Sequence, residues 1–357
     1  MITSGYRSIK SFQFTGINRL PTIGANDSRK TAGDKQMKRT LTAAMAAGLL
    51  ALGAGAAQAQ DWPTRPIKIL VGSAPGGGTD AMARAVADRL GPLLKQPVVV
   101  DNRPGASNTL AADAAAKSTD GHTMVMGVVT AHAIAPHLLK LNYDSNRDLV
   151  PVAFVGAVPN VLVVSNSVPA DSVQGLVKLA KQEPGKLNYA TSGAGSTQHI
   201  AAEMFKDAAG VELVHVPYKG SGPALIDLVG GQVQLSFDTM PSVIGQIRNN
   251  KVRALAVTTQ KRNPQLPNVP TLAEAGVPNI EMSAWYGIYM PAATPKAVQD
   301  TVHDAVNQVL AMPETKTRLD AIGAEITPMT QAQFAQFHAA EYRRFGEVIK
   351  KNHIKLD

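Results

Sequence analysis

The chain has 357 residues, of which 45% are hydrophobic and 17% charged, a globular composition with enough length for two domains. It contains no cysteine, which excludes disulfides, thiolate metal sites and cysteine nucleophiles. The net charge of +8 is concentrated in residues 1–59, and the rest of the chain holds 27 basic and 25 acidic side chains, so it lacks the basic footprint of a nucleic-acid-binding protein.

Residues 37–59 have the three parts of a secretory signal peptide. Lys38 and Arg39 form the charged start, residues 41–52 form an apolar run too short to span a bilayer, and Ala57-Gln58-Ala59 fits the cleavage rule. A buried alanine-rich helix is the alternative. We predict cleavage after Ala59, export to the periplasm and no direct membrane insertion afterwards. Because a signal normally starts at its own methionine, residues 1–36 are predicted to be a misassigned or disordered extension.

Strands and helices alternate after residue 60. Short apolar runs bounded by proline or glycine indicate buried strands, and Met82, Val86 and Leu90 recur at helical spacing. We predict strands at 67–72, 97–102 and 123–129, with helices at 80–94 and 110–117 between them. This alternation favours a parallel sheet covered on both faces.

The alternation then repeats in a second α/β unit. We predict strands at 160–165, 187–192, 211–218, 233–239 and 252–259, with helices at 172–185, 198–209 and 223–231. Residues 283–292 form an extended crossing segment, and two helices close the chain. With the hinge expected near 158–166 and 283–290, domain 1 comprises residues 60–161 and 286–357, and domain 2 comprises residues 162–285.

The first glycine-rich turn, "SAPGGG" at residues 73–78, joins a strand to a helix and so aims free backbone N–H groups at one point, as in anion sites. Thr79 and Asp80 stand where a P-loop needs Lys and Ser/Thr, and Ala81 replaces the last glycine of a Rossmann fingerprint. Asp80 would also repel a polyphosphate. A small carboxylate remains, or a turn whose glycines serve geometry alone.

The second turn of this kind is "TSGAGSTQH" at residues 191–199. Ser196 or Thr197 can cap the following helix, and His199 in its first turn either touches a ligand or packs. Two such turns facing each other could clamp the two ends of a dicarboxylate. Ser196, His199 and Asp238 could on paper form a hydrolase triad, although their spacing does not support one.

The chain from Trp62 onward resembles the extracytoplasmic solute receptors of tripartite tricarboxylate transporters, the Bug proteins. The resemblance rests on "WPTRPIKILVGSAPGGGTD", "VVVDNRPGASN", "DGHTMVMG", "LNYATSGAGSTQH", "VPYKGSGPALIDLVGGQVQLSFDT", "NVPTLAEAGVP" and "AWYGIYMPAATP" in this order. It implies an α/β, two-domain type II periplasmic-binding-protein fold with a ligand cleft between the domains and a two-segment hinge. It implies no enzyme activity, no cofactor and no metal.

The resemblance also implies a set of ligand-binding positions in both turns and at the rim of the cleft. The first turn gives Ala74, Gly76, Gly77, Gly78, Thr79 and Asp80, and the second gives Ser192, Gly193, Ser196, Thr197, Gln198 and His199. Asp238 matches a position that bonds an amine, hydroxyl or water, while Thr130, Ala131, His132, Tyr218 and Gly220 line the rim. Ala74 departs from the family, because many relatives have phenylalanine or tyrosine there.

These features together predict a monomeric periplasmic receptor that captures a small organic carboxylate and delivers it to a membrane permease. Since Asp80 and Asp238 would repel several negative charges, we expect a ligand with few of them, or with a positive group. Two alternatives remain. One is a secreted serine hydrolase that uses Ser196 and His199, and the other is a ligand-sensing subunit for a non-transport membrane partner.

Overall fold

Nine strands form the framework of the computed structural model, which describes residues 62–352 and 354–355. The strand order is β2-β1-β3-β9-β4-β7-β5-β6, with β8 paired to β4. The predicted extension and signal peptide lie outside the described residues. No helix in the described part of the chain is long and apolar enough to cross a membrane.

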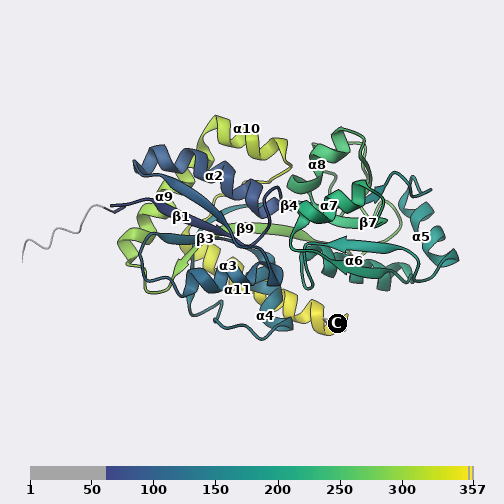
Figure 1. Cartoon of the computed structure of the whole chain (residues 1–357), viewed down its shortest axis with the longest axis horizontal. Helices are drawn as coiled ribbons and strands as arrows, with labels where there is room; N and C mark the ends of the chain where they lie inside the picture. The colour runs from purple at the N-terminus through teal and green to yellow at the C-terminus, as the bar shows by residue number, and fades with distance from the viewer. Residues whose placement is uncertain (1–61, 353, 356–357) are drawn as a thin grey trace, which may run out of the picture. The chain divides into compact units, whose positions relative to one another are not determined.

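The first α/β unit contains the parallel strands β1 (Ile67–Val71), β2 (Val98–Asn102) and β3 (Thr123–Val128). Helices α2 (Gly78–Leu94) and α3 (Thr109–Ala116) connect them, so the predicted elements are confirmed to within a few residues. A short 3₁₀ turn, η1 (Ala106–Asn108), precedes α3, and a π-helical turn, η2 (Thr130–Ile134), and α4 (Ala135–Leu138) follow β3. Figure 1 shows α2 and α3 on opposite sides of these strands.

The second α/β unit contains β5 (Asn188–Thr191), β6 (Val214–Pro217), β7 (Leu235–Thr239) and β8 (Val252–Val257). Strand β5 is parallel to both β6 and β7. Its helices are α5 (Val173–Gln182), α6 (Thr197–Ala209), α7 (Ser221–Val229) and α8 (Met240–Arg248). The predicted stop of α6 at Gly210 is confirmed, because this residue adopts the left-handed conformation of a helix C-cap.

Two long antiparallel strands, β4 (Leu149–Ser165) and β9 (Ser283–Pro291), connect the two units. The predicted parallel pairing is confirmed among β1, β2 and β3 and among β5, β6 and β7, and the crossing strands add antiparallel pairs, so the sheet as a whole is mixed. Strand β4 pairs with β9 as far as Pro159 and with β7 from Asn160 onward. It begins 11 residues before the predicted strand, because its prolines and Gly156 interrupt the apolar pattern whereas the backbone absorbs them at shifts of register.

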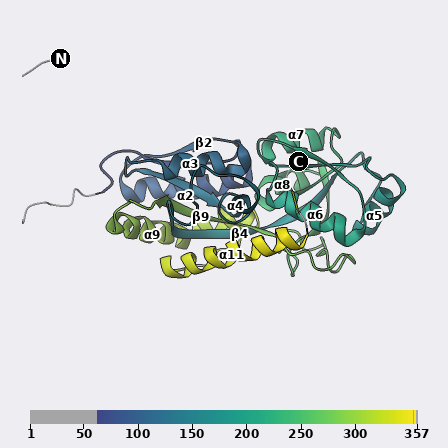
Figure 2. The same cartoon turned by 90° about the horizontal axis from the view of Figure 1, so that it is seen from below.

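Three helices follow β9, namely α9 (Lys296–Ala311), α10 (Pro313–Ala321) and α11 (Gln331–Lys351), where two were predicted. Pro313 cannot continue α9 and begins a new helix instead. Helix α11 packs along β4, as Figure 2 shows. The described residues from 62 onward belong to one compact unit. The domain boundaries stay a prediction, although β4 changes partner two residues before the expected end of the first segment of domain 1.

Candidate ligand-binding site

Four helices of the two α/β units begin around one small cavity of about 20 Å³. Each of these helices follows a strand. The first residue or the N-cap of each helix lines the cavity, namely Gly78 of α2, Thr197 of α6, Ser221 of α7 and Thr239 before α8. A helix N-terminus offers unpaired N–H groups and a partial positive charge. Four of them aimed at one point make a site suited to an anion.

The cavity has walls from both α/β units. Seven of the predicted residues line it, namely Gly77, Gly78, Thr79, Thr130, Ser192, Thr197 and Gln198. Seven others were not predicted, namely Ser73, Asn108, Val128, Ser221, Thr239, Ala284 and Tyr286. Ser221 and Thr239 stand where helices start after β6 and β7, a position that the sequence could have indicated. Tyr286 and Ala284 lie in the crossing strand β9, where no motif marks them.

Gly78 lets the N-terminus of α2 approach the second α/β unit. A Cβ atom at this position would lie 2.5 Å from Thr239 Oγ1 and 2.8 Å from the Tyr286 hydroxyl oxygen. A side chain there would force the Thr239 and Tyr286 side chains to shift. The glycine is therefore required by a close approach between helices α2 and α8 and strand β9.

Two residues that line this cavity have a buried polar atom without a hydrogen-bond partner among the described residues, Ser73 Oγ and Asn108 Oδ1. Buried polar atoms are otherwise nearly always paired, so unpaired ones at a cavity wall indicate a ligand-binding role. Asn108 also ends a run of three residues with positive φ, at 44°, 54° and 71° for Ala106, Ser107 and Asn108. Each residue in such a conformation costs about 1–3 kcal/mol of folding free energy, and backbone strain of this kind is typical of functional sites.

Gln198 is the centre of the polar wall contributed by the second α/β unit. Its Nε2 donates to Ser221 Oγ and Asp238 Oδ1, both at 3.0 Å, and its Oε1 accepts from Ser192 Oγ at 2.6 Å. Asp238 lies behind this wall, not in the cavity lining. Burial raises its pKa, although hydrogen bonds from Ser221, Gln198 and the Thr239 N–H oppose the rise.

Asp80 does not line the cavity but holds the first glycine-rich turn from behind. Its carboxylate accepts from the Gly76 N–H at 3.0 Å, from Arg84 Nε at 3.0 Å and from Asn102 Nδ2 at 2.9 Å. Burial favours a higher pKa, but these three hydrogen bonds and the Arg84 charge lower it. The expectation that Asp80 repels the ligand therefore loses its basis, because Arg84 compensates its charge.

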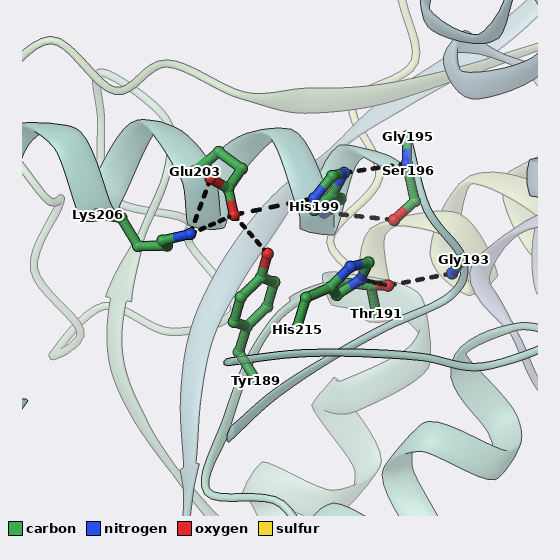
Figure 3. Close-up of polar contacts among 9 residues, drawn as sticks. All are labelled: Tyr189, Thr191, Gly193, Gly195, Ser196, His199, Glu203, Lys206 and His215. Carbon is green, nitrogen blue, oxygen red and sulfur yellow. Dashed lines mark hydrogen bonds and ion pairs between the residues drawn. The ribbon is translucent and has the colours of Figure 1, made fainter. Parts of the chain in front are cut away.

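Ser196 and His199 serve the second glycine-rich turn, and neither lines the cavity. Ser196 Oγ caps α6 by accepting from the His199 N–H, and the His199 ring stacks on His215 at 4.3 Å. Its Nδ1 accepts from the Gly195 N–H and its Nε2 faces Glu203, as Figure 3 shows. These contacts turn the imidazole towards groups other than Ser196 Oγ and Asp238, so the geometry does not support the triad.

The other predicted positions do not line the cavity. A Cβ atom on Gly220 would lie 2.9 Å from the Ala74 nitrogen, and one on Gly193 would lie 3.1 Å from Ser107 Oγ, so Ala74, Gly193 and Gly220 lie where the two units touch. Gly76 donates to Asp80, Ala131 accepts from Tyr143, and Tyr218 donates to Asp227. His132 is fully buried on Tyr289, with ring centroids 3.9 Å apart, and burial lowers its pKa well below the usual value.

Similarity to known proteins agrees with this geometry. Residues 82–354 match the tripartite tricarboxylate transporter family receptor. BugT of Bordetella pertussis is 37% identical over 301 residues, which cover 84% of this chain and 92% of BugT. Two structures from R. palustris are similar. Rpa4515 with adipate has a TM-score of 0.80 at 38% identity and covers 82% of this chain and 99% of its own. MatC with bound malate has a TM-score of 0.77 at 31% identity, and the match covers 81% of this chain and 100% of MatC.

These likenesses confirm both the resemblance and the fold class that the sequence indicates. The chain has the mixed α/β, two-domain architecture of periplasmic binding proteins. The family consists of solute-binding receptors of membrane transporters. The protein belongs to the tripartite tricarboxylate transporter receptor family, as a Bug-type solute-binding protein.

Proposed function

We propose that this protein is a periplasmic receptor that captures a small dicarboxylate between its two α/β units and delivers it to a membrane permease. The convergence of four helix N-termini on one cavity, next to the unpaired atoms of Ser73 and Asn108, carries this proposal. The adipate and malate bound by Rpa4515 and MatC support the ligand class.

Capture requires no arginine at the cavity wall. Hydroxyl groups of Thr79 and Thr197 and the N–H groups at the helix starts supply the hydrogen bonds to the carboxylates. The two units would open and close about β4, which pairs with strands of both units, and about the start of β9. A ligand that touches both walls binds the closed state more tightly and so shifts the equilibrium towards it.

Delivery, localisation and the absence of catalysis are part of the proposal. We expect a monomer that is exported with loss of residues 37–59 and that releases its ligand unchanged. A hydrolase would instead turn over ester or amide substrates, and that turnover would disappear in the Ser196→Ala variant.

Thermal unfolding of residues 60–357 with malate, adipate, citrate, acetate and acidic amino acids tests the ligand class. At a concentration one hundred times the Kd, a ligand adds about 2.7 kcal/mol to the free energy of unfolding. A shift with dicarboxylates supports the proposal. Mass spectrometry of the denatured protein identifies any ligand that already occupies the site. No shift from a preparation shown to be ligand-free would overturn the ligand class.

A matched pair of variants places the binding at this cavity. Asn108→Gly removes the carboxamide, whose Nδ2 can donate to a carboxylate, while keeping a residue that tolerates φ of 71°, and we expect it to weaken dicarboxylate binding about tenfold. Asn250→Gly makes the same change at φ of 53° on an exposed turn, and we expect it to leave binding as it is. Equal affinities in both variants would contradict the assignment of the site.

A further inference from the structure

The second glycine-rich turn is held by a stack of aromatic rings on the side away from the cavity. Figure 3 shows His199 of α6 above His215 of β6, and Tyr189 of β5 lies at 4.9 Å from the His215 ring. The Gly195 N–H donates to His199 Nδ1 at 3.1 Å. The Gly193 N–H donates to Thr191 Oγ1, which is itself 2.7 Å from His215 Nε2. Side chains beneath the turn thus fix two of its backbone amides.

The bond from Gly195 defines the protonation state that His199 needs. Because Nδ1 accepts an N–H, it carries no hydrogen, and the neutral ring bears its proton on Nε2. Nε2 faces Glu203 Oε1 at 3.8 Å. A second proton would go to Nδ1, where two N–H groups would then face each other. The turn and the protonated ring are therefore incompatible in this arrangement.

The charged groups around His199 give the protonated ring a second partner. Glu203 lies one turn along α6, and its carboxylate also accepts from Tyr189 at 2.6 Å and from Lys206 at 2.9 Å. Burial favours a higher pKa for Glu203, but these two hydrogen bonds and the charge of Lys206 lower it, as does the charge of His199 once that ring is protonated. Glu203 is thus an anion that would hold an imidazolium after the Gly195 bond is lost.

The turn that His199 holds contributes three residues to the binding site. It contains Ser192, Thr197 and Gln198, and all three line the cavity. Its Ala194 carbonyl accepts a hydrogen bond from Ser107 of the first α/β unit. A displaced turn would therefore move a cavity wall and break a contact between the two units.

We propose that His199 is a positioning residue that makes ligand capture sensitive to pH. The neutral ring fixes the turn in its binding arrangement, and protonation exchanges the Gly195 bond for the Glu203 ion pair and releases the turn. Affinity then falls as the pH drops through the range in which histidine titrates. This inference rests on the proposed function, because it takes the cavity as the ligand site.

The test compares three proteins by calorimetry with malate and adipate at pH 7.5 and 5.5. We expect the wild type to lose at least tenfold in affinity at the lower pH. In His199→Asn, the amide oxygen can accept from Gly195 but cannot be protonated, so the loss should shrink to less than threefold. The control His303→Asn removes a histidine whose Nδ1 donates to the Val152 carbonyl and should keep the wild-type ratio. Asp238, the stacked His215 of β6 and the ligands are common to all three proteins, so an equal loss in His199→Asn and wild type would overturn the proposal.

A second measurement separates this proposal from the assignment of the ligand. Hydrogen exchange of the Gly195 amide is followed in ligand-free protein, after correction for the intrinsic effect of pH. We expect protection to fall at pH 5.5 in the wild type and to stay in His199→Asn, even if neither malate nor adipate binds. In Glu203→Gln, which lacks the counter-ion, we expect release at a lower pH. Protection that is unchanged in the wild type at pH 5.5 would refute the role of His199.

Discussion

The two glycine-rich turns look alike in the sequence, but different residues hold them from behind. Asp80 holds the first turn by accepting the Gly76 N–H, and Arg84 and Asn102 complete its set of partners. His199 holds the second turn by accepting the Gly195 N–H. In both cases a side chain in the first helical turn reaches back to a glycine amide four residues earlier. The same backbone task is therefore done once by a permanent anion and once by a neutral ring that can be protonated.

The starts of the two helices that follow these turns, α2 and α6, also differ. Helix α2 has no side-chain cap, and its N-cap residue is Gly77, so the amides of its first turn are left for a ligand. Helix α6 is capped by Ser196, whose side chain accepts a hydrogen bond from one backbone amide in the first turn of that helix. We expect the first turn to contribute more backbone hydrogen bonds to the ligand and the second turn more side-chain ones.

The largest effect is expected from Gly78→Ala in the first turn. The added Cβ would overlap Thr239 Oγ1 and the Tyr286 hydroxyl across the two α/β units, at an expected cost of about 1–3 kcal/mol in the closed state. We expect affinity for malate or adipate, measured by calorimetry, to fall by up to about one hundredfold while circular dichroism shows a folded protein. Gly245→Ala is the control, since its Cβ meets nothing within 4 Å on α8. Wild-type affinity in Gly78→Ala would mean that the two units do not approach each other as described.

A smaller effect, on stability, is expected from Asp80→Asn. The pKa of Asp80 is lowered in the folded protein, so its charged form contributes stability above the unfolded pKa and loses it as the pH falls through the folded pKa. We expect urea unfolding at pH 7 to show a loss of about 2 kcal/mol, because a hydrogen-bonded buried charge is replaced by an amide. At pH 3 the difference from wild type should shrink. A deficit that is the same at both pH values would show that the charge of Asp80 does not hold the turn.

The sequence predicts the two turns and most of the elements around them, because strands, glycines and helix starts are local features. Asp80 and His199 could be named from the sequence, but their direction could not. Both lie in the first turn of a helix, where a side chain reaches either forward to a ligand or back to the preceding loop. The long strand β4 and the contribution of Tyr286 depend on pairing between segments more than 120 residues apart. Such pairing leaves no local pattern.

The smallest effect is expected in the segment that joins the first α/β unit to the second turn. Ser107 donates to the Ala194 carbonyl, and to reach it the chain keeps Ala106, Ser107 and Asn108 at positive φ. Ala106→Gly relieves roughly 1–2 kcal/mol of strain at φ of 44°, whereas the added flexibility of glycine in the unfolded chain offsets about 0.5–1 kcal/mol of that gain. We therefore expect a stabilisation of a few tenths of a kcal/mol in urea unfolding, with dicarboxylate affinity raised or unchanged. A destabilised Ala106→Gly variant would mean that the segment is not strained in solution. The contact between Ser107 and the second turn would then cost no backbone strain in the first α/β unit.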